Sequence, residues 1–162
     1  MKKFKNQTIA TFLDALSQKT PVPGGGAVAA LCAANAAGLL VMAARYSVDR
    51  AKTRAIRKRL VAIVHQGEQL RDRFLELMDL DAQAYMKVVK ARSKDAVEKR
   101  RAKKAAAAVP GEMARLCQKA VDLAPDLVTH GSPYLLSDVE VAIELLYAAY
   151  QAAMINVHVN QS

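Results

Sequence analysis

The sequence predicts an all-α protein, a bundle of five to six helices that forms a single domain over residues 1–162. Apolar residues recur at intervals of three and four through most of the chain, which is the period of a helix face. The 7 glycines and 5 prolines are few and mostly confined to two short stretches, so long helices are expected and a many-stranded sheet is not. Two of the expected helices are apolar on nearly every side. Such helices must be covered, so we expect the core to continue across a helical interface in a homodimer.

The first helix is expected over Thr8 to Lys19, because four apolar residues in it share one helix face. It must end at the stretch Thr20 to Gly26, where two prolines and three consecutive glycines forbid its continuation. A second helix, from Ala27 to Tyr46, follows directly. The apolar face of the first helix consists of Ile9, Phe12, Leu13 and Leu16.

The stretch Ala27 to Ala44 is apolar apart from Asn35 and is long enough to suggest a membrane span. Half of it is alanine, however, which gains little from transfer into lipid. Small residues at this density suit close packing between helices. We therefore expect a buried helix and no membrane partner.

A third, long helix is predicted by one apolar seam that continues for roughly nine turns, with a break expected near Gly67. Asp81 occupies a seam position where an apolar residue would be expected, whereas Asp72 and Asp79 point elsewhere. An inward-facing carboxylate is either a functional group or a buried cap of another helix. The seam consists of Ile56, Leu60, Ile63, Gly67, Leu70, Phe74, Leu77, Asp81, Ala84 and Val88.

The remaining helices are predicted from residues that typically start, interrupt or end a helix. Pro110 marks a helix start or a kink, and Pro125 interrupts the same helix near its end. The run His130 to Pro133 is a stop signal. Ser137 to Glu140 has the Ser-x-x-Glu form of a capping box, which would open a last helix that reaches about Asn160.

The chain carries a formal net charge of +9, which favours anionic partners. Nine lysines and arginines lie between Lys87 and Lys104, against two acids. This stretch is a solvated helix face, a site for a polyanionic small molecule, or part of a nucleic-acid-binding helical module. It lacks interleaved aromatic residues and a helix-turn-helix pattern, so nucleic acid is disfavoured.

The two cysteines, Cys32 and Cys117, lie far apart in apolar helical patterns and are expected to be buried thiols in a reducing compartment. The basic N-terminus is not followed by a continuous apolar segment, so secretion is disfavoured and a cytoplasmic location is expected. His65, His130 and His158 have no metal-ligand spacing among themselves or with the cysteines. No metal and no tightly bound cofactor are expected.

The run Gly24 to Gly26 is not a common nucleotide-binding loop, because no strand precedes it and no Gly-Lys-Ser/Thr follows. It opens a helix, so its unshielded N–H groups can face an approaching ligand. The alternative is a tight turn between helices that merely needs glycine.

Several motifs in order along the chain resemble the C-terminal domain family of formiminotransferase-cyclodeaminase. They are Phe12–Leu16, Pro21–Leu31, Leu70–Asp72, Asp79–Tyr85, Val109–Pro110, Gly131–Pro133, Ser137–Asp138 and Asn156–Asn160. The resemblance spans nearly the whole chain. It implies an all-helical homodimer that either hydrolyses methenyltetrahydrofolate or closes formiminotetrahydrofolate with loss of ammonia. A tetrahydrofolate derivative would be the substrate.

The resemblance also implies a set of site residues. Both reactions need a group that moves a proton at nitrogen or water, and a carboxylate beside a cationic substrate suits that role. The catalytic residues would be Asp81 and Asp138, and the substrate-binding residues Pro23, Gly24, Gly25, Gly26, Ser137, Asn156 and Asn160. Asp138 and Ser137 could instead stabilise the start of their helix, and the two asparagines could bond across a dimer.

The chain departs from the family pattern at Ser47 to Arg50, at Ser132 and at Tyr134, and it stops soon after Asn160. These differences leave an altered substrate or an inactive relative as alternatives. A non-catalytic folate-binding or scaffold protein is a further alternative. The sequence favours neither the deaminase nor the hydrolase, because both use the same cationic intermediate.

Overall fold

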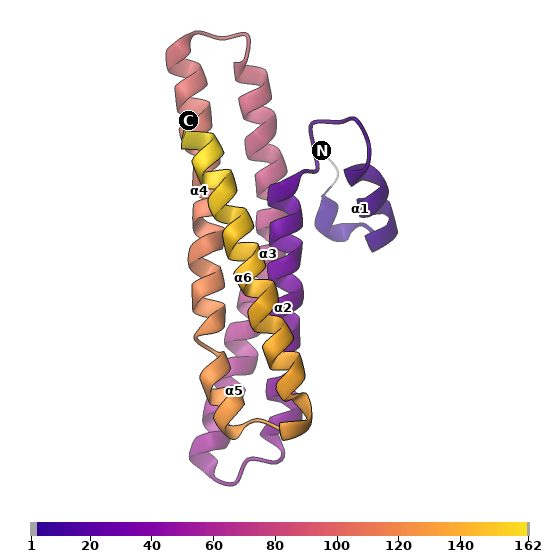
Figure 1. Cartoon of the computed structure of the whole chain (residues 1–162), viewed down its shortest axis with the longest axis vertical. Helices are drawn as coiled ribbons and strands as arrows, with labels where there is room; N and C mark the ends of the chain where they lie inside the picture. The colour runs from indigo at the N-terminus through magenta and orange to yellow at the C-terminus, as the bar shows by residue number, and fades with distance from the viewer. Residues whose placement is uncertain (1–2, 162) are drawn as a thin grey trace.

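The computed structural model describes residues 3–161, and over this range every regular element is a helix. The elements are η1 (Phe4–Asn6), α1 (Ile9–Leu16), α2 (Gly25–Val48), α3 (Arg54–Ala91), α4 (Ala96–Val121), α5 (Ala124–His130), η2 (Pro133–Leu135) and α6 (Leu136–Gln161). The four long helices α2, α3, α4 and α6 run side by side as one elongated bundle, with α1 beside it and α5 at one end (Figure 1). The prediction of an all-α bundle is confirmed.

The centre of the bundle is α2, which packs against α3 and α6. Most of its alanines are buried, because a helix with such small side chains can be approached closely by others. By length and composition α2 could cross a membrane, but 61% of its apolar window is buried inside the protein. The expectation of a helix enclosed by its neighbours is therefore confirmed.

α3 runs without interruption for 38 residues, so the break expected near Gly67 is wrong. Thr53 begins the helix by accepting a hydrogen bond from the Ile56 N–H. Gly67 has a different purpose, because a Cβ atom there would lie 2.6 Å from Val41 Cγ2 of α2. The glycine allows α2 and α3 to pack closely.

α4 corrects two predictions about proline. Pro110 was expected to start a helix or to kink one, and because it lies in the interior of α4 the first of these alternatives is wrong. Pro125 does not interrupt α4, since α4 ends at Val121 and Pro125 lies in the first turn of α5, where a missing N–H is tolerated. The predicted stop is confirmed, because α5 ends at His130.

The predicted capping box of the last helix is wrong. The short helix η2 leads directly into α6, which begins at Leu136, so Ser137 is already a helical residue. The helix itself reaches Gln161, as far as expected.

The N-terminal segment is anchored to α3 by one buried hydrogen bond. The Phe4 N–H donates to Asp79 Oδ1 over 2.6 Å, and the Phe4 ring meets the Phe12 ring edge to face. Thr8 accepts a hydrogen bond from the Thr11 N–H and so begins α1, which is shorter than predicted at both ends. Asp79 is thus a structural anchor.

Candidate active site

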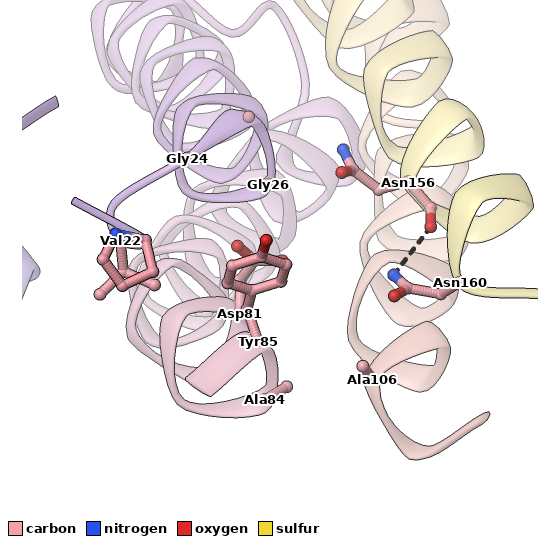
Figure 2. A pocket seen from close by; sticks show the side chains of 11 residues that line it. Val22, Gly24, Gly26, Asp81, Ala84, Tyr85, Ala106, Asn156 and Asn160 are labelled. Carbon is pink, nitrogen blue, oxygen red and sulfur yellow. Dashed lines mark hydrogen bonds between the residues drawn. The ribbon is translucent and has the colours of Figure 1, made fainter. Parts of the chain in front are cut away.

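A pocket of about 250 Å³ lies where the first turn of α2 meets α3, α4 and the end of α6. Four separate segments of the chain form its wall, and Figure 2 shows Asp81 lying between the start of α2 and the two asparagines of α6. The lining residues are Pro21, Val22, Gly24, Gly25, Gly26, Asp81, Ala84, Tyr85, Ala106, Asn156 and Asn160.

Asp81 projects from α3 against the first turn of α2. A Cβ atom at Gly26 would lie 2.5 Å from Asp81 Oδ2 and still closer to Oδ1, so this contact requires glycine. The carboxylate accepts a hydrogen bond from the Ala27 N–H. Asp81 therefore caps the start of α2, as one of the two alternatives from the sequence predicted. It also lines the pocket.

Burial raises the pKa of Asp81 to about 6, because removal from water penalises the charged form, and the hydrogen bond from Ala27 opposes part of that rise. A carboxyl group with a pKa near 6 can both accept and return a proton near neutral pH. Perturbed pKa values of this kind concentrate at functional sites.

Asn156 and Asn160 face the pocket from α6. Each side chain donates through Nδ2 to the carbonyl four residues earlier, over 2.8 Å to Ala152 and 2.9 Å to Asn156 respectively (Figure 2). Among residues 3–160, neither Oδ1 atom accepts a hydrogen bond from the protein. Both oxygens can therefore accept a hydrogen bond from a ligand in the pocket.

Tyr85 follows Asp81 by one helical turn, and both side chains line the pocket (Figure 2). Its hydroxyl oxygen accepts a hydrogen bond from Arg92 Nη2 over 3.3 Å. Sequence reasoning missed Tyr85 as a site residue, although its four-residue spacing from Asp81 was a usable signal. It also missed Pro21, Val22, Ala84 and Ala106, which carry no recognisable chemical signal.

The structure brings together six of the expected site residues and separates three. Pro23 is buried and does not line the pocket, and the peptide bond between Val22 and Pro23 is cis. Ser137 and Asp138 lie in the first turn of α6, and Asn156 lies 18 positions further along than Asp138. That spacing is about 27 Å along the helix axis. Within one chain, Ser137 and Asp138 therefore do not line the Asp81 pocket, and their role as site residues stays a prediction.

No cluster of three or more His, Cys, Asp or Glu side chains that could hold a metal ion occurs in the described part of the chain. Both cysteines are free thiols, with Cys117 buried and Cys32 partly buried. Burial raises the pKa of Cys117 to about 12, and the neighbouring Cys32 adds to that rise. These thiols are packing groups of the bundle.

The same arrangement of helices occurs in the solved structure of formiminotetrahydrofolate cyclodeaminase from Thermotoga maritima, with a TM-score of 0.93 and 29% sequence identity. The match covers 96% of this chain and 79% of that one. Among curated proteins, a methenyltetrahydrofolate cyclohydrolase from Methylorubrum extorquens is 31% identical over 165 residues, covering 96% of this chain and 79% of the relative. The fold is thus that of the cyclodeaminase-like helical proteins.

The family model described as formiminotransferase-cyclodeaminase matches residues 8–162. This chain belongs to that family.

Proposed function

We propose that the pocket around Asp81 catalyses a reaction at the carbon that bridges two folate nitrogens. The reaction is the hydrolysis of methenyltetrahydrofolate or the closure of formiminotetrahydrofolate with loss of ammonia. One observation carries the proposal. A carboxylate whose pKa is raised to about 6 lines a pocket that it shares with two side-chain amides. The names of the two relatives support both versions of the reaction.

In the hydrolytic version, Asp81 is the general base. Water attacks the methenyl carbon while the carboxylate takes one of its protons, which gives a neutral tetrahedral adduct. The protonated carboxyl then gives that proton to the departing nitrogen as the carbon–nitrogen bond breaks. The hydroxyl of the adduct loses its own proton to the carboxylate, which releases it to water, and the formyl group forms. A positioned group of this kind contributes about 10² to 10⁴ in rate.

In the deaminating version, the folate nitrogen attacks the formimino carbon and loses its proton to Asp81. The amino group then leaves as ammonia after it receives that proton. In both versions the substrate is a cation, and a bound cation lowers the pKa of Asp81 again. The ionised form is thus favoured when the substrate is present.

The glycine-rich turn does not hold the reacting cation, because the positive end of the α2 dipole would repel it. It provides a surface without side chains on which the pterin ring can lie. The Oδ1 atoms of Asn156 and Asn160 accept hydrogen bonds from ring N–H groups. The folate is then held with its bridging carbon toward Asp81.

The test is an absorbance assay of methenyltetrahydrofolate with the purified protein. One arm follows the disappearance of this compound, and the other follows its formation from formiminotetrahydrofolate. Turnover in one arm decides between hydrolase and deaminase. No enzyme-dependent change in either arm, at enzyme concentrations comparable to the substrate, would reject the proposal and leave a non-catalytic folate-binding protein.

We also propose that two copies of the chain associate through α6. This helix leaves several large apolar side chains exposed, with Val141 at 50%, Tyr147 at 61% and Ile155 at 64%. Such a surface favours a partner of the same kind. Light scattering after size exclusion would show twice the monomer mass, and Ile155→Asp would shift it toward the monomer.

The free thiols further support a reducing, cytoplasmic location.

A further inference from the structure

The residues at which the chain departs from its family pattern lie together at one end of the bundle. At this end α2 finishes, α3 begins and η2 leads into α6, far from the Asp81 pocket at the other end of α2 (Figure 1). The Ser132 N–H donates a hydrogen bond over 2.8 Å to Ser47 Oγ, which is 85 positions earlier in the chain. The Arg50 guanidinium carbon lies 6.0 Å from the centroid of the Tyr134 ring, a cation–π contact. The departures therefore form one connected surface.

Two tyrosine rings are open to solvent on this surface. Tyr134 is 82% exposed, and Tyr46, in the last turn of α2 and four residues before Arg50, is 64% exposed. Tyr134 belongs to η2, which begins with Pro133, so a proline restricts the backbone that presents its ring. An exposed aromatic ring offers a flat face on which a planar group of a ligand can stack.

Cations surround the two rings. Between Arg50 and Arg59 the sequence contains six lysines and arginines and no acid. Arg57 pairs with Asp49, and Arg59 pairs with Asp126. The cations of this stretch without a carboxylate partner among residues 3–160 are Arg50, Lys52, Arg54 and Lys58. These four outnumber the two acids at the start of α6, Asp138 and Glu140, so the surface attracts anions.

We propose that this surface binds single-stranded nucleic acid, whose bases stack on Tyr46 and Tyr134 and whose phosphates lie among the unpaired cations. A single strand uses both features, because its bases have free flat faces and its backbone is anionic. The basic stretch from Lys87 to Lys104 argued against nucleic acid because it lacks interleaved aromatic residues. At this end of the bundle, folding brings an aromatic residue to the basic stretch from a distant segment. The inference does not depend on turnover of a folate.

The first test is fluorescence anisotropy of a labelled oligouridine of about 12 nucleotides with the full-length protein. The Kd should lie between about 1 and 100 µM at physiological salt and should rise with added salt. Tyr134→Ala should raise the Kd at least about fivefold, whereas Tyr134→Phe, which keeps the ring, should stay within about twofold. Absence of binding up to about 100 µM, or equal Kd values for the two variants, would overturn the inference.

A charge comparison locates the binding surface. The triple variant Arg50→Gln, Lys52→Gln, Arg54→Gln should raise the Kd at least about tenfold and make its salt dependence shallower. The matched control is Lys99→Gln, Arg100→Gln, Lys103→Gln, which removes the same charge from exposed positions of α4 and should change the Kd by less than about threefold. Circular dichroism should be unchanged in both, because all six side chains are exposed. Equal weakening in both would assign binding to the charge of the whole protein and reject the inference.

A spectroscopic test reports stacking directly. The chain contains no tryptophan, so one introduced by substitution is the only one in the protein. The emission of Tyr134→Trp should be quenched when the oligouridine binds, and that of Tyr147→Trp, at another exposed tyrosine on α6, should not. Equal quenching in both, or quenching only in Tyr147→Trp, would overturn the inference. Binding to phosphatidylserine vesicles that is lost in Tyr134→Ala, without binding of the oligouridine, would assign the surface to a membrane instead.

Discussion

Replacing Gly26 by alanine would place a methyl group in the space that the Asp81 carboxylate fills. The added Cβ would lie 2.5 Å from Oδ2, whereas ordinary contacts begin near 3.4 Å. The carboxylate must therefore move by roughly 1 Å and give up its hydrogen bond from Ala27. A displacement of that size at a reacting group lowers turnover by about 10²-fold.

The effect of Gly26→Ala on stability should be much smaller than its effect on activity. Loss of a charged hydrogen bond costs about 1.5 to 3 kcal/mol, and alanine regains up to about 1 kcal/mol of helix propensity. We expect a net destabilisation of about 1 to 2 kcal/mol. The fold should survive, because the atoms that must move are the end of one side chain.

The assay measures kcat/KM with the folate substrate together with thermal unfolding by circular dichroism. Gly38→Ala is the matched control, since it lies in the same helix and a Cβ atom there meets nothing within 4 Å. The control should keep activity within about twofold and gain up to about 1 kcal/mol in stability. Gly26→Ala activity equal to that of the control would refute a positioned Asp81 carboxylate.

Asp81→Asn should lower turnover by about 10² to 10⁴ with an unchanged helical spectrum. In the unaltered protein kcat/KM should rise as pH increases through about 6, and the substitution should abolish that rise. The pKa of Asp81 is higher in the fold than its ordinary value of 3.8, so its contribution to stability is complete below pH 3.8 and is lost as pH rises through 6. Asp81→Asn should therefore stabilise the protein at pH 8, by on the order of 3 kcal/mol, and not at pH 3.5, as measured by urea unfolding. Asn156→Ala should raise the KM about tenfold through loss of one acceptor, whereas the exposed Asn35→Ala should not change it. Gly67→Ala should destabilise the bundle by about 1 to 3 kcal/mol, because its Cβ would overlap a side chain of α2, while Gly111→Ala, with open space around it, should not.

The sequence was a good guide to which side of a helix a residue occupies. The apolar phase of α3 placed Asp81 on the inward face, and the structure finds it in a pocket wall. The same reasoning grouped Asn156 and Asn160, one turn apart on an apolar helix, and both line that pocket. Periodicity predicts such facts because side-chain direction repeats with the helical turn.

The position of a residue along the bundle axis was harder to predict from the sequence. Asp138 belongs to the same helix as Asn156, yet about 27 Å separates their turns, because each residue adds about 1.5 Å of rise. A motif order along the chain contains no information about which ends of antiparallel helices meet. The sequence shows the basic residues between Lys87 and Lys104 only as a charge run. The packing of α4 beside α3 places five of them around one groove, namely Arg92, Lys99, Arg100, Lys103 and Lys104. The single-domain expectation stays a prediction.

The Phe4 N–H donates a hydrogen bond to Asp79, which precedes Asp81 by two residues on α3. The segment between this anchor and α2 includes Pro21 and Val22, which form part of the pocket wall. Its geometry therefore depends on the first few residues of the chain. A truncation or a fusion that displaces Phe4 would loosen that wall from one side while the four long helices stayed packed, so a recombinant form altered there can be well folded and still impaired toward its ligand.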